Sequence, residues 1–351
     1  MSAAGGAAPL DPVEQLERIA FLLEAALEPS YRVKAFRGAA RTLRGLPAGE
    51  AEARATAGTL RDLDGIGEVT AQVVTEALTG EVPDYLRRLQ ATEGSPVDAA
   101  AQALRAALRG DCHTHSDWSD GGSPIEEMAR AARDLGHSYI VLTDHSPRLR
   151  VARGLSPERL REQLRVVAAL NDELAPFRVL TGIEVDINED GSLDQQPELL
   201  AQLDVVVASV HSKLRMPAAE MTPRMVRAIS DPHTDILGHC TGRNISERGR
   251  GGKVRPESEF DAELVFAACA RFDVAVEVNC RPERQDPPKR LLRLAVEAGC
   301  RLAIDTDAHA PGQLTWQPGG CDRAVRCGVT ADRVVNALGA DDLVAWAAAR
   351  R

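Results

Sequence analysis

The sequence predicts an α/β protein in which β/α units around a parallel sheet follow a small all-helical domain. Residues 11–90 repeat apolar side chains at helical spacing, whereas from residue 110 onward short β-branched runs alternate with amphipathic segments. The second pattern is typical of parallel strands connected by helices. The length of 351 residues fits two domains, or one large barrel with an appendage.

Three helical segments stand out in the N-terminal part, and they cover residues 12–27, 33–46 and 69–80. Residues 92–99 (TEGSPVDA) then interrupt the pattern with Gly, Ser and Pro, and an Ala-rich segment carries the chain onward. We therefore expect a helical domain over residues 10–95, a linker over 96–109 and the β/α domain over 110–345.

The β/α domain is expected to contain seven strands: Gly110–His115, Tyr139–His145, Arg178–Asp186, Asp204–His211, Ile236–Cys240, Val274–Cys280 and Arg301–His309. A helix is predicted after the first strand. Ser123 would be its N-cap, Pro124 its first turn, Glu126 the partner in a capping box and Gly136 its end. This punctuation predicts at least one complete β/α unit.

The composition is that of an ordinary globular protein, with 44% hydrophobic and 27% charged residues, which excludes a disordered or fibrous chain. No apolar run approaches the ~18 residues of a membrane helix, and the first residues lack the layout of a signal peptide. We expect a cytoplasmic protein with no membrane partner, whose seven cysteines are reduced thiols. The net charge of −10 disfavours nucleic-acid binding over the whole surface, so any polyanion must bind locally.

Histidines recur where the predicted strands end. Six of the eight histidines lie at or just beyond the C-terminal end of a strand: His113, His115, His145, His211, His239 and His309. In β/α barrels these strand ends converge on one face, which gathers residues that are distant in sequence. A single such histidine is more often structural, but the recurrence on several strands indicates one site.

Three carboxylates join these histidines: Asp120 after the first strand, Glu184 on the third, and Asp307 two positions before His309. Imidazole nitrogens and carboxylate oxygens suit Zn, Mn or Fe. The nine groups exceed the roughly four to six that one ion uses. The sequence therefore predicts two or three divalent metal ions.

Seven segments carry a resemblance to a known family: DCHTHSDWSDGG (111–122), YIVLTDHS (139–146), GIEVDINEDGSLD (182–194), LDVVVASVHSKL (203–214), DILGHCTGR (235–243), VEVNCRPERQDPP (276–288) and AIDTDAHAPGQL (303–314). They resemble the PHP (polymerase and histidinol phosphatase) metallohydrolases, above all the PHP region that ends bacterial family X DNA polymerases. The resemblance covers about residues 110–340. It implies a distorted (β/α)7 TIM-like barrel.

The same resemblance implies how the nine groups divide among the ions. His113, His115, Glu184 and Asp307 would hold the first ion, and Glu184, His211 and His239 the second, so that Glu184 bridges the two. Asp120, His145 and His309 would hold the third.

A multinuclear centre of this kind indicates phosphoester hydrolysis. Metal ions about 3.5–4 Å apart lower the pKa of a shared water and offset the charge on a phosphoryl group under attack. Glu184, Asp307 and His309 are the expected catalytic residues, and Arg243 and Lys213 are expected to orient the phosphate because guanidinium and ammonium groups suit its oxygens. The basic loop 248–255 (RGRGGKVR) is either a phosphate contact or a solvated turn.

Residues 60–80 of the helical domain match a helix-hairpin-helix motif. Gly65 and Gly67 flank Ile66 in a tight turn, where the missing Cβ atoms let backbone N–H groups approach a phosphate at a helix N-terminus. The alternative is a plain connection between two helices. Upstream, the spacing of four basic residues predicts one helix face, either DNA-binding or merely solvated, made by Lys34, Arg37, Arg41 and Arg44.

This domain also resembles the small N-terminal helical domain of the family X polymerases. The chain has no room between about residues 95 and 110 for palm and fingers domains, so we infer that it is no polymerase. Residues 1–100 contain ten Lys or Arg and fifteen Asp or Glu, so DNA binding by this domain alone should be weak and salt-sensitive.

The leading hypothesis is a multinuclear metallophosphoesterase that removes a nucleotide or a phosphate from nucleic-acid 3′ ends, as an exonuclease or 3′-phosphatase, with DNA bound through the N-terminal domain. A small-molecule phosphatase of the histidinol-phosphatase type is the first alternative, and the acidic charge balance favours it. A DNA-binding module with structural metals is the second.

Overall fold

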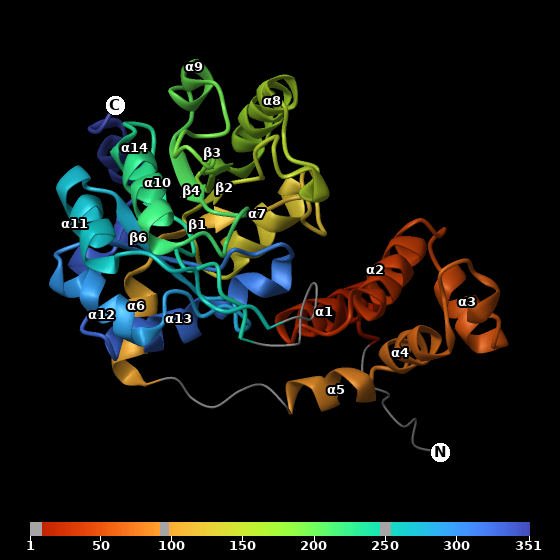
Figure 1. Ribbon diagram of the computed structural model, residues 1–351. Helices are drawn as coiled ribbons and strands as arrows, with labels where there is room; N and C mark the ends of the chain where they lie inside the picture. Colours follow the sequence, from red (N-terminus) through yellow and green to blue (C-terminus); the bar gives the residue numbers. More distant parts are fainter. Residues whose placement is uncertain (1–8, 92–97, 246–253) are drawn as a thin grey trace. The chain divides into compact units, whose positions relative to one another are not determined.

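The computed structural model describes residues 9–91, 98–245 and 254–351, and it divides into two compact units, Met1–Pro96 and Val97–Arg351. The first unit is helical and the second is a helix-covered barrel of parallel strands (Figure 1). Across the described residues, every helix falls short of the length and apolar character that crossing a membrane demands.

The helical unit consists of α1 (Pro12–Ala25), α2 (Ser30–Arg44), α3 (Glu50–Ala57), α4 (Glu68–Leu78) and α5 (Asp84–Gln90). Its core contains Leu16, Ile19 and Leu23, which are fully buried and lie three and four positions apart on α1. Asp11 caps α1, because its side chain accepts a hydrogen bond from the N–H of Val13.

The barrel contains seven parallel strands, each paired with its neighbours in chain order. They are β1 (Gly110–Thr114), β2 (Tyr139–Leu142), β3 (Arg178–Asp186), β4 (Val205–Ser209), β5 (Ile236–Leu237), β6 (Ala275–Asn279) and β7 (Leu302–Asp305). The N–H of His115 donates to the carbonyl of Ala308 at 2.8 Å, so the two ends of the sheet meet and the barrel is nearly closed. The predicted distorted (β/α)7 fold is confirmed.

Helices surround this sheet (Figure 1). They are α6 (Ala99–Ala107), α7 (Ile125–Asp134), α8 (Pro157–Leu174), α9 (Pro197–Leu200), α10 (Ala218–Ser230), α11 (Ala262–Phe272), α12 (Lys289–Glu297), α13 (Gln317–Val325) and α14 (Ala340–Ala348). Every residue of β1, β2, β4, β6 and β7 is buried, as expected for parallel strands covered by helices on one side and packed within the barrel on the other.

Two local features differ from expectation. Residues 99–107, which we expected to lie in the linker, form α6 of the barrel unit, because Ala101 and Leu104 give this helix an apolar face that is buried.

Helix α7 begins at Ile125 with Pro124 at the N-cap, and the Ser123 side chain makes no cap bond. The end of α7 follows the prediction, because Gly136 has the left-handed φ of +85°.

Two adjacent glycines in α13 offer a test of how tightly the barrel is packed. A Cβ at Gly319 meets nothing within 4 Å, whereas a Cβ at Gly320 would lie 2.1 Å from Cys280 Sγ and 3.1 Å from Ile304 Cγ2. We expect Gly319→Ala to raise the free energy of unfolding by about 0.5–1 kcal/mol through helix propensity. Gly320→Ala should lower it by about 1–3 kcal/mol through overpacking.

Denaturant unfolding of both variants, followed by circular dichroism, measures the difference. Equal effects of the two substitutions would contradict the close packing of α13 on β6 and β7.

Candidate metal centre

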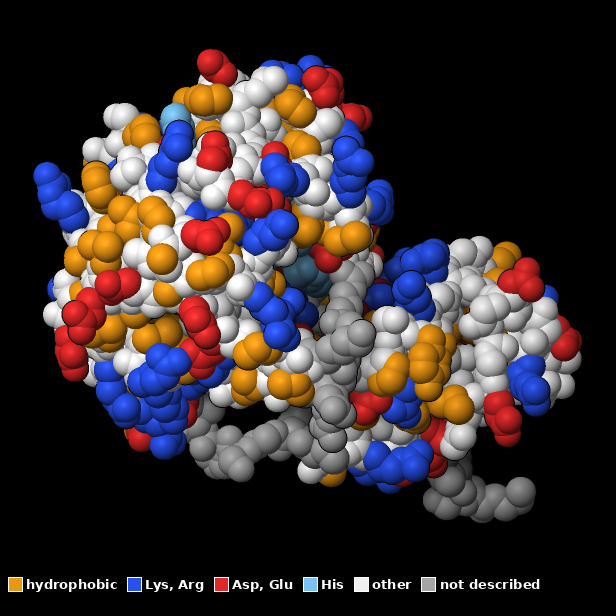
Figure 2. All heavy atoms as spheres, in the orientation of Figure 1, with side chains coloured by type: hydrophobic (Ala, Val, Ile, Leu, Met, Phe, Trp, Pro, Cys, Tyr) orange, Lys and Arg blue, Asp and Glu red, His pale blue; other side chains and the backbone are white. Residues whose placement is uncertain are grey.

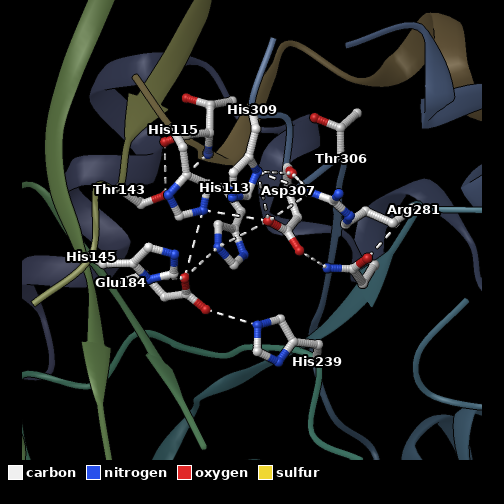
Figure 3. A network of polar contacts seen from close by, with 12 residues as sticks. His113, His115, Thr143, His145, Glu184, His239, Arg281, Thr306, Asp307 and His309 are labelled. Atoms are coloured by element: carbon white, nitrogen blue, oxygen red, sulfur yellow. Dashed lines mark hydrogen bonds and ion pairs between the residues drawn. The ribbon is translucent and has the colours of Figure 1, made fainter. Parts of the chain in front are cut away.

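The C-terminal ends of the strands bring six histidines into one cluster. Figure 3 shows His113, His115, His145, His239 and His309 around Glu184 and Asp307. His113 lies in β1 and His115 just after it, and the two-residue spacing points both side chains to the same side of the strand. Their ring centroids lie 5.1 Å apart, and that of His309, after β7, lies 4.2 Å from His115. Cys112, directly before His113, points to the other side of the strand and packs in the hydrophobic core.

Glu184, on β3, faces five imidazoles with its two carboxylate oxygens, of which that of His115 is the most distant, with Nε2 3.6 Å from Oε2. Its Oε2 lies 2.9 Å from Nδ1 of His145 and 3.3 Å from Nε2 of His113. Its Oε1 lies 2.8 Å from Nε2 of His239 and 3.2 Å from Nε2 of His211. Because these histidines follow or belong to β1, β2, β4 and β5, Glu184 links strands from both halves of the barrel.

Two further carboxylates complete the set. Asp307 Oδ1 lies 3.4 Å from Nε2 of His115. Asp120 Oδ1 lies 3.4 Å from Nε2 of His145 and 3.2 Å from Nε2 of His309. The structure thus places all nine residues that sequence analysis selected in one cluster, including three groups whose ligand atoms all lie within 4.8 Å of one another: His115, Asp120, His145 and His309; His113, His115 and Asp307; and His145, Glu184 and His211.

The residues present fit a metal centre. His113 Nε2 and both ring nitrogens of His115 are buried and have no hydrogen-bond partner among the described residues. Leaving buried polar atoms without a partner is costly, so several such nitrogens facing carboxylates fit a site that binds a cation. The donor set of imidazoles and carboxylates suits divalent ions such as Zn, Mn or Fe.

The charges of the cluster agree with this assignment. Burial favours the protonated form of Glu184, but His211, His113 and His145 outweigh burial and hold the pKa of Glu184 well below its ordinary value. Burial, together with the neighbouring histidines, holds the pKa of His115 well below its ordinary value. An ionised carboxylate and a neutral imidazole are the forms that bind a metal.

A second layer of side chains, which sequence analysis missed, orients the histidines. Glu277 Oε1 lies 2.6 Å from Nδ1 of His113, and Asp186 contacts Nδ1 of His211. Carboxylates in this position fix the ring orientation and raise the basicity of the opposite nitrogen. Glu277 lies two residues before Asn279, at the end of β6, so the strand-end rule applied to carboxylates on every strand would have found it.

The cluster opens into a cavity of about 230 Å³. Its lining residues are Asp120, His145, Leu149, Val151, Ala152, Glu184, His211, Asn244, Arg255, Arg281, Glu283, Arg284, Asp307 and His309. Histidine side chains lie at the bottom of a hollow on the surface (Figure 2). Arg255 belongs to the basic loop 248–255 that sequence analysis named, whereas Arg281 and Arg284 were missed, although they follow directly after β6 in the segment VEVNCRPERQDPP.

These arginines have different surroundings. Arg281 is buried, and its Nη1 lies 2.9 Å from Nδ1 of His309 and donates to the carbonyl of Asp307 at 2.8 Å. Arg284 Nε lies 3.4 Å from Asp307 Oδ2, and its side chain is 20% exposed. Arg281 is therefore held by the protein, while Arg284 also faces the cavity.

The structure does not bring Arg243 and Lys213 into this cavity. Arg243 donates through Nε to the carbonyl of Arg284 at 2.9 Å, and it lines a neighbouring cavity of about 680 Å³. Lys213 is exposed and has the left-handed φ of 54°. Sequence proximity to His239 and His211 is a weak guide here, because a loop residue can turn away from the strand end it follows. Residues 248–253 of the basic loop 248–255 lie outside the described residues.

The four basic residues predicted on α2 fall into two stripes. Arg37 forms a bidentate ion pair with Glu24 of α1, through Nε at 2.8 Å and Nη2 at 3.0 Å, and Arg44 contacts Glu17 of α1. Lys34 and Arg41 are exposed. The predicted face is therefore half neutralised by the neighbouring helix.

The predicted turn has the expected backbone. Gly65 has the left-handed φ of +81°, and the Thr42 hydroxyl donates to the carbonyl of Asp64 at 2.9 Å, which fixes the turn against α2. The N–H of Gly67 donates to Thr70 Oγ1 at 2.9 Å. Helix α4 begins directly after Gly67, so the N–H groups of its first turn lie at the hairpin.

Comparisons with known proteins agree with both units. Residues 111–249 match the model of the PHP domain, and residues 10–82 match that of a helix-hairpin-helix domain. The DNA polymerase/3′-5′ exonuclease PolX of Bacillus subtilis is 38% identical over 239 residues, which are 68% of this chain and 41% of that protein. The chain thus spans less than half the length of this relative.

Shorter relatives match over most of their length. A probable phosphatase of Shewanella sp. is 30% identical over 226 residues, 61% of this chain and 80% of that protein. One from Thermoanaerobacter sp. is 28% identical over 241 residues, 64% of this chain and 89% of that protein. Among solved structures, the histidinol phosphate phosphatase of Lactococcus lactis has a TM-score of 0.45 at 16% identity, over 64% of this chain and 95% of that one.

Removing the central carboxylate tests the metal centre. Glu184→Gln keeps the shape of the side chain but removes the charge that faces five imidazoles, so we expect the loss of about one bound ion per chain or more. Protein dialysed against Mn²⁺ or Zn²⁺ and then against buffer is assayed by elemental analysis. Glu189→Gln, an exposed carboxylate just beyond β3, is the matched control and should bind as much metal as the unchanged chain.

Proposed function

The chain belongs to the PHP domain family, and on this basis we propose that it is a metal-dependent phosphoesterase that hydrolyses phosphoester bonds at nucleic-acid 3′ ends. The observation that carries the proposal is the cluster of nine buried or half-buried imidazole and carboxylate side chains at the bottom of a cavity that arginines also line. The helix-hairpin-helix match favours a nucleic acid as the substrate.

The proposed ligand sets follow the family resemblance. His113, His115, Glu184 and Asp307 would hold one ion, Glu184, His211 and His239 a second, and Asp120, His145 and His309 a third. Divalent ions bound there would supply an activated water and stabilise the negative charge of a phosphoryl group during hydrolysis. Glu184, Asp307 and His309 are the proposed catalytic residues because each belongs to a proposed ligand set and lines the cavity.

The protein's own groups would bind and orient the phosphate. Arg255 and Arg284 line the cavity, and their guanidinium groups can donate paired hydrogen bonds to phosphate oxygens. We propose them for the role that sequence analysis gave to Arg243 and Lys213. Arg281 acts as a positioning residue, since its contacts with Asp307 and His309 hold these side chains in place.

The helical unit would bind the nucleic-acid backbone at its hairpin. The turn at Gly65 exposes the N-terminus of α4, where N–H groups and the helix dipole favour a phosphate. The exposed Lys34 and Arg41 add positive charge on α2, which contacts the turn through Thr42. Binding by this unit should be weak, because acidic residues outnumber basic ones in residues 1–100.

The alternative that the geometry also favours is a small-molecule phosphatase of the histidinol-phosphatase type. The cavity of about 230 Å³ is smaller than the roughly 300–1,000 Å³ of pockets that enclose a drug-sized ligand. A small phosphomonoester therefore fits the cavity without any contact to the helical unit.

A substrate panel separates these two functions. With Mn²⁺ or Zn²⁺ added, we expect turnover of 3′-phosphorylated nicked DNA or of single-stranded DNA, because such substrates offer a phosphoester to the metal centre and a phosphate backbone to the hairpin. Release of phosphate and shortening of labelled strands are measured against histidinol phosphate and free nucleotides. Turnover confined to the small compounds would replace the nucleic-acid assignment by the alternative.

Lys34 and Arg41, which are exposed on α2, give a second test. We expect Lys34→Ala with Arg41→Ala to weaken DNA binding and to reduce the slope of log K against log salt by about 1–2, because each phosphate contact contributes about 0.9. Fluorescence anisotropy at several salt concentrations measures the slope. Arg87→Ala with Arg88→Ala removes the same charge from α5 of the same unit and should leave the slope unchanged.

A further inference from the structure

The segment between His145 and α8 forms one wall of the metal cavity. Leu149, Val151 and Ala152 of this segment line the cavity beside His145, which belongs to the metal cluster. Ala152 is buried, but the Val151 side chain is 94% exposed, the largest exposed fraction among the large hydrophobic side chains of the described residues. A valine at the mouth of a polar site therefore presents an apolar surface to whatever enters.

Val151 is exposed because the backbone holds it there. The N–H of Arg148 donates to Asp194 Oδ2 at 2.6 Å, and the N–H of Leu155 donates to the carbonyl of His145 at 2.7 Å. Between these anchors the N–H of Gly154 bonds the carbonyl of Leu149 at 3.2 Å. A Cβ at Gly154 would lie 1.8 Å from the carbonyl oxygen of Ser146, so this fold of the segment requires glycine there. The apolar side chain thus has a fixed position on the rim.

The cavity is too small to enclose a nucleotide together with its phosphate. Its volume of about 230 Å³ lies below the roughly 300–1,000 Å³ range of pockets that bury drug-sized ligands. A phosphate at the metal cluster fills the bottom of the cavity, so the remainder of a larger ester must extend across the rim. Leu149 and Val151 lie on that path because they line the same cavity.

The rim segment is also basic. Arg148, Arg150 and Arg153 are exposed and lie on both sides of Val151 in the sequence. Positive charge beside an apolar side chain matches a nucleotide chain, whose phosphates alternate with bases that offer apolar faces. A small phosphomonoester that ends within the cavity would contact neither the exposed arginines nor the Val151 side chain.

We propose that residues 148–153 form a subsite for the nucleoside adjoining the scissile phosphate, with Val151 against its base and Arg148 and Arg150 near the next phosphate of the chain. This subsite rests on the proposed phosphoesterase function and deepens it, because it selects esters of nucleosides over other phosphate esters. Val151 is then a specificity-determining residue, separate from the groups that bind metal and phosphate.

Placing a negative charge at position 151 tests the subsite. Hydrolysis of thymidine 3′-phosphate and of glycerol 2-phosphate is compared, since both release phosphate from a secondary alcohol and only the first carries a base. We expect Val151→Asp to lower kcat/KM for thymidine 3′-phosphate by about tenfold more than for glycerol 2-phosphate, mainly through KM. Val151→Leu, which keeps the apolar surface, should retain the ratio of the unchanged chain.

Val166→Asp is the matched control, because Val166 is an exposed valine on α8 that lies outside the cavity lining, and it should leave the ratio unchanged. An equal effect of Val151→Asp on both substrates, or no effect on either, overturns the subsite while the phosphoesterase assignment stands. An unchanged chain that hydrolyses neither ester with Mn²⁺ or Zn²⁺ overturns the proposed function and the subsite together.

Discussion

The buried carboxylate of Glu184 is the interaction on which the rest of the site depends. Its two oxygens face five imidazoles that belong to or follow four different strands, and an unpaired charge at this depth would be strongly destabilising. The surrounding histidines hold its pKa low, while Glu277 and Asp186 orient two of those histidines from behind. The barrel and the metal cluster are therefore stabilised by the same contacts, which favours a rigid site with little room for rearrangement.

The sequence was sufficient to predict the barrel and the cluster, because strand ends follow a simple geometric rule. His113 and His115 share a face through their two-residue spacing, and parallel strands place His145, His211 and His239 at the same end. The arginines that line the cavity could not be predicted in the same way. Whether Arg243 or Arg284 faces the cavity depends on which carbonyl groups each loop offers, and Arg243 is held by backbone carbonyls of the segment that contains Arg284.

The surface charge of the helical unit could not be predicted fully from the sequence either. Spacing alone placed Arg37 and Arg44 on one face with Lys34 and Arg41. Packing of α1 against α2 then sets Glu24 and Glu17 opposite the first two, which spacing within α2 does not reveal. A basic face predicted from one helix must therefore be compared with the acidic residues of its neighbour. On this face, only Lys34 and Arg41, which α1 does not neutralise, add net positive charge that could attract a polyanion.

The closure between β1 and β7 has a consequence for biosynthesis. Two of the three groups with close ligand atoms contain Asp307 or His309, which are the last of the nine residues to be synthesised. The group of His145, Glu184 and His211 is complete about a hundred residues earlier. A nascent or prematurely ended chain thus possesses part of the coordination set without the residues that close the ring.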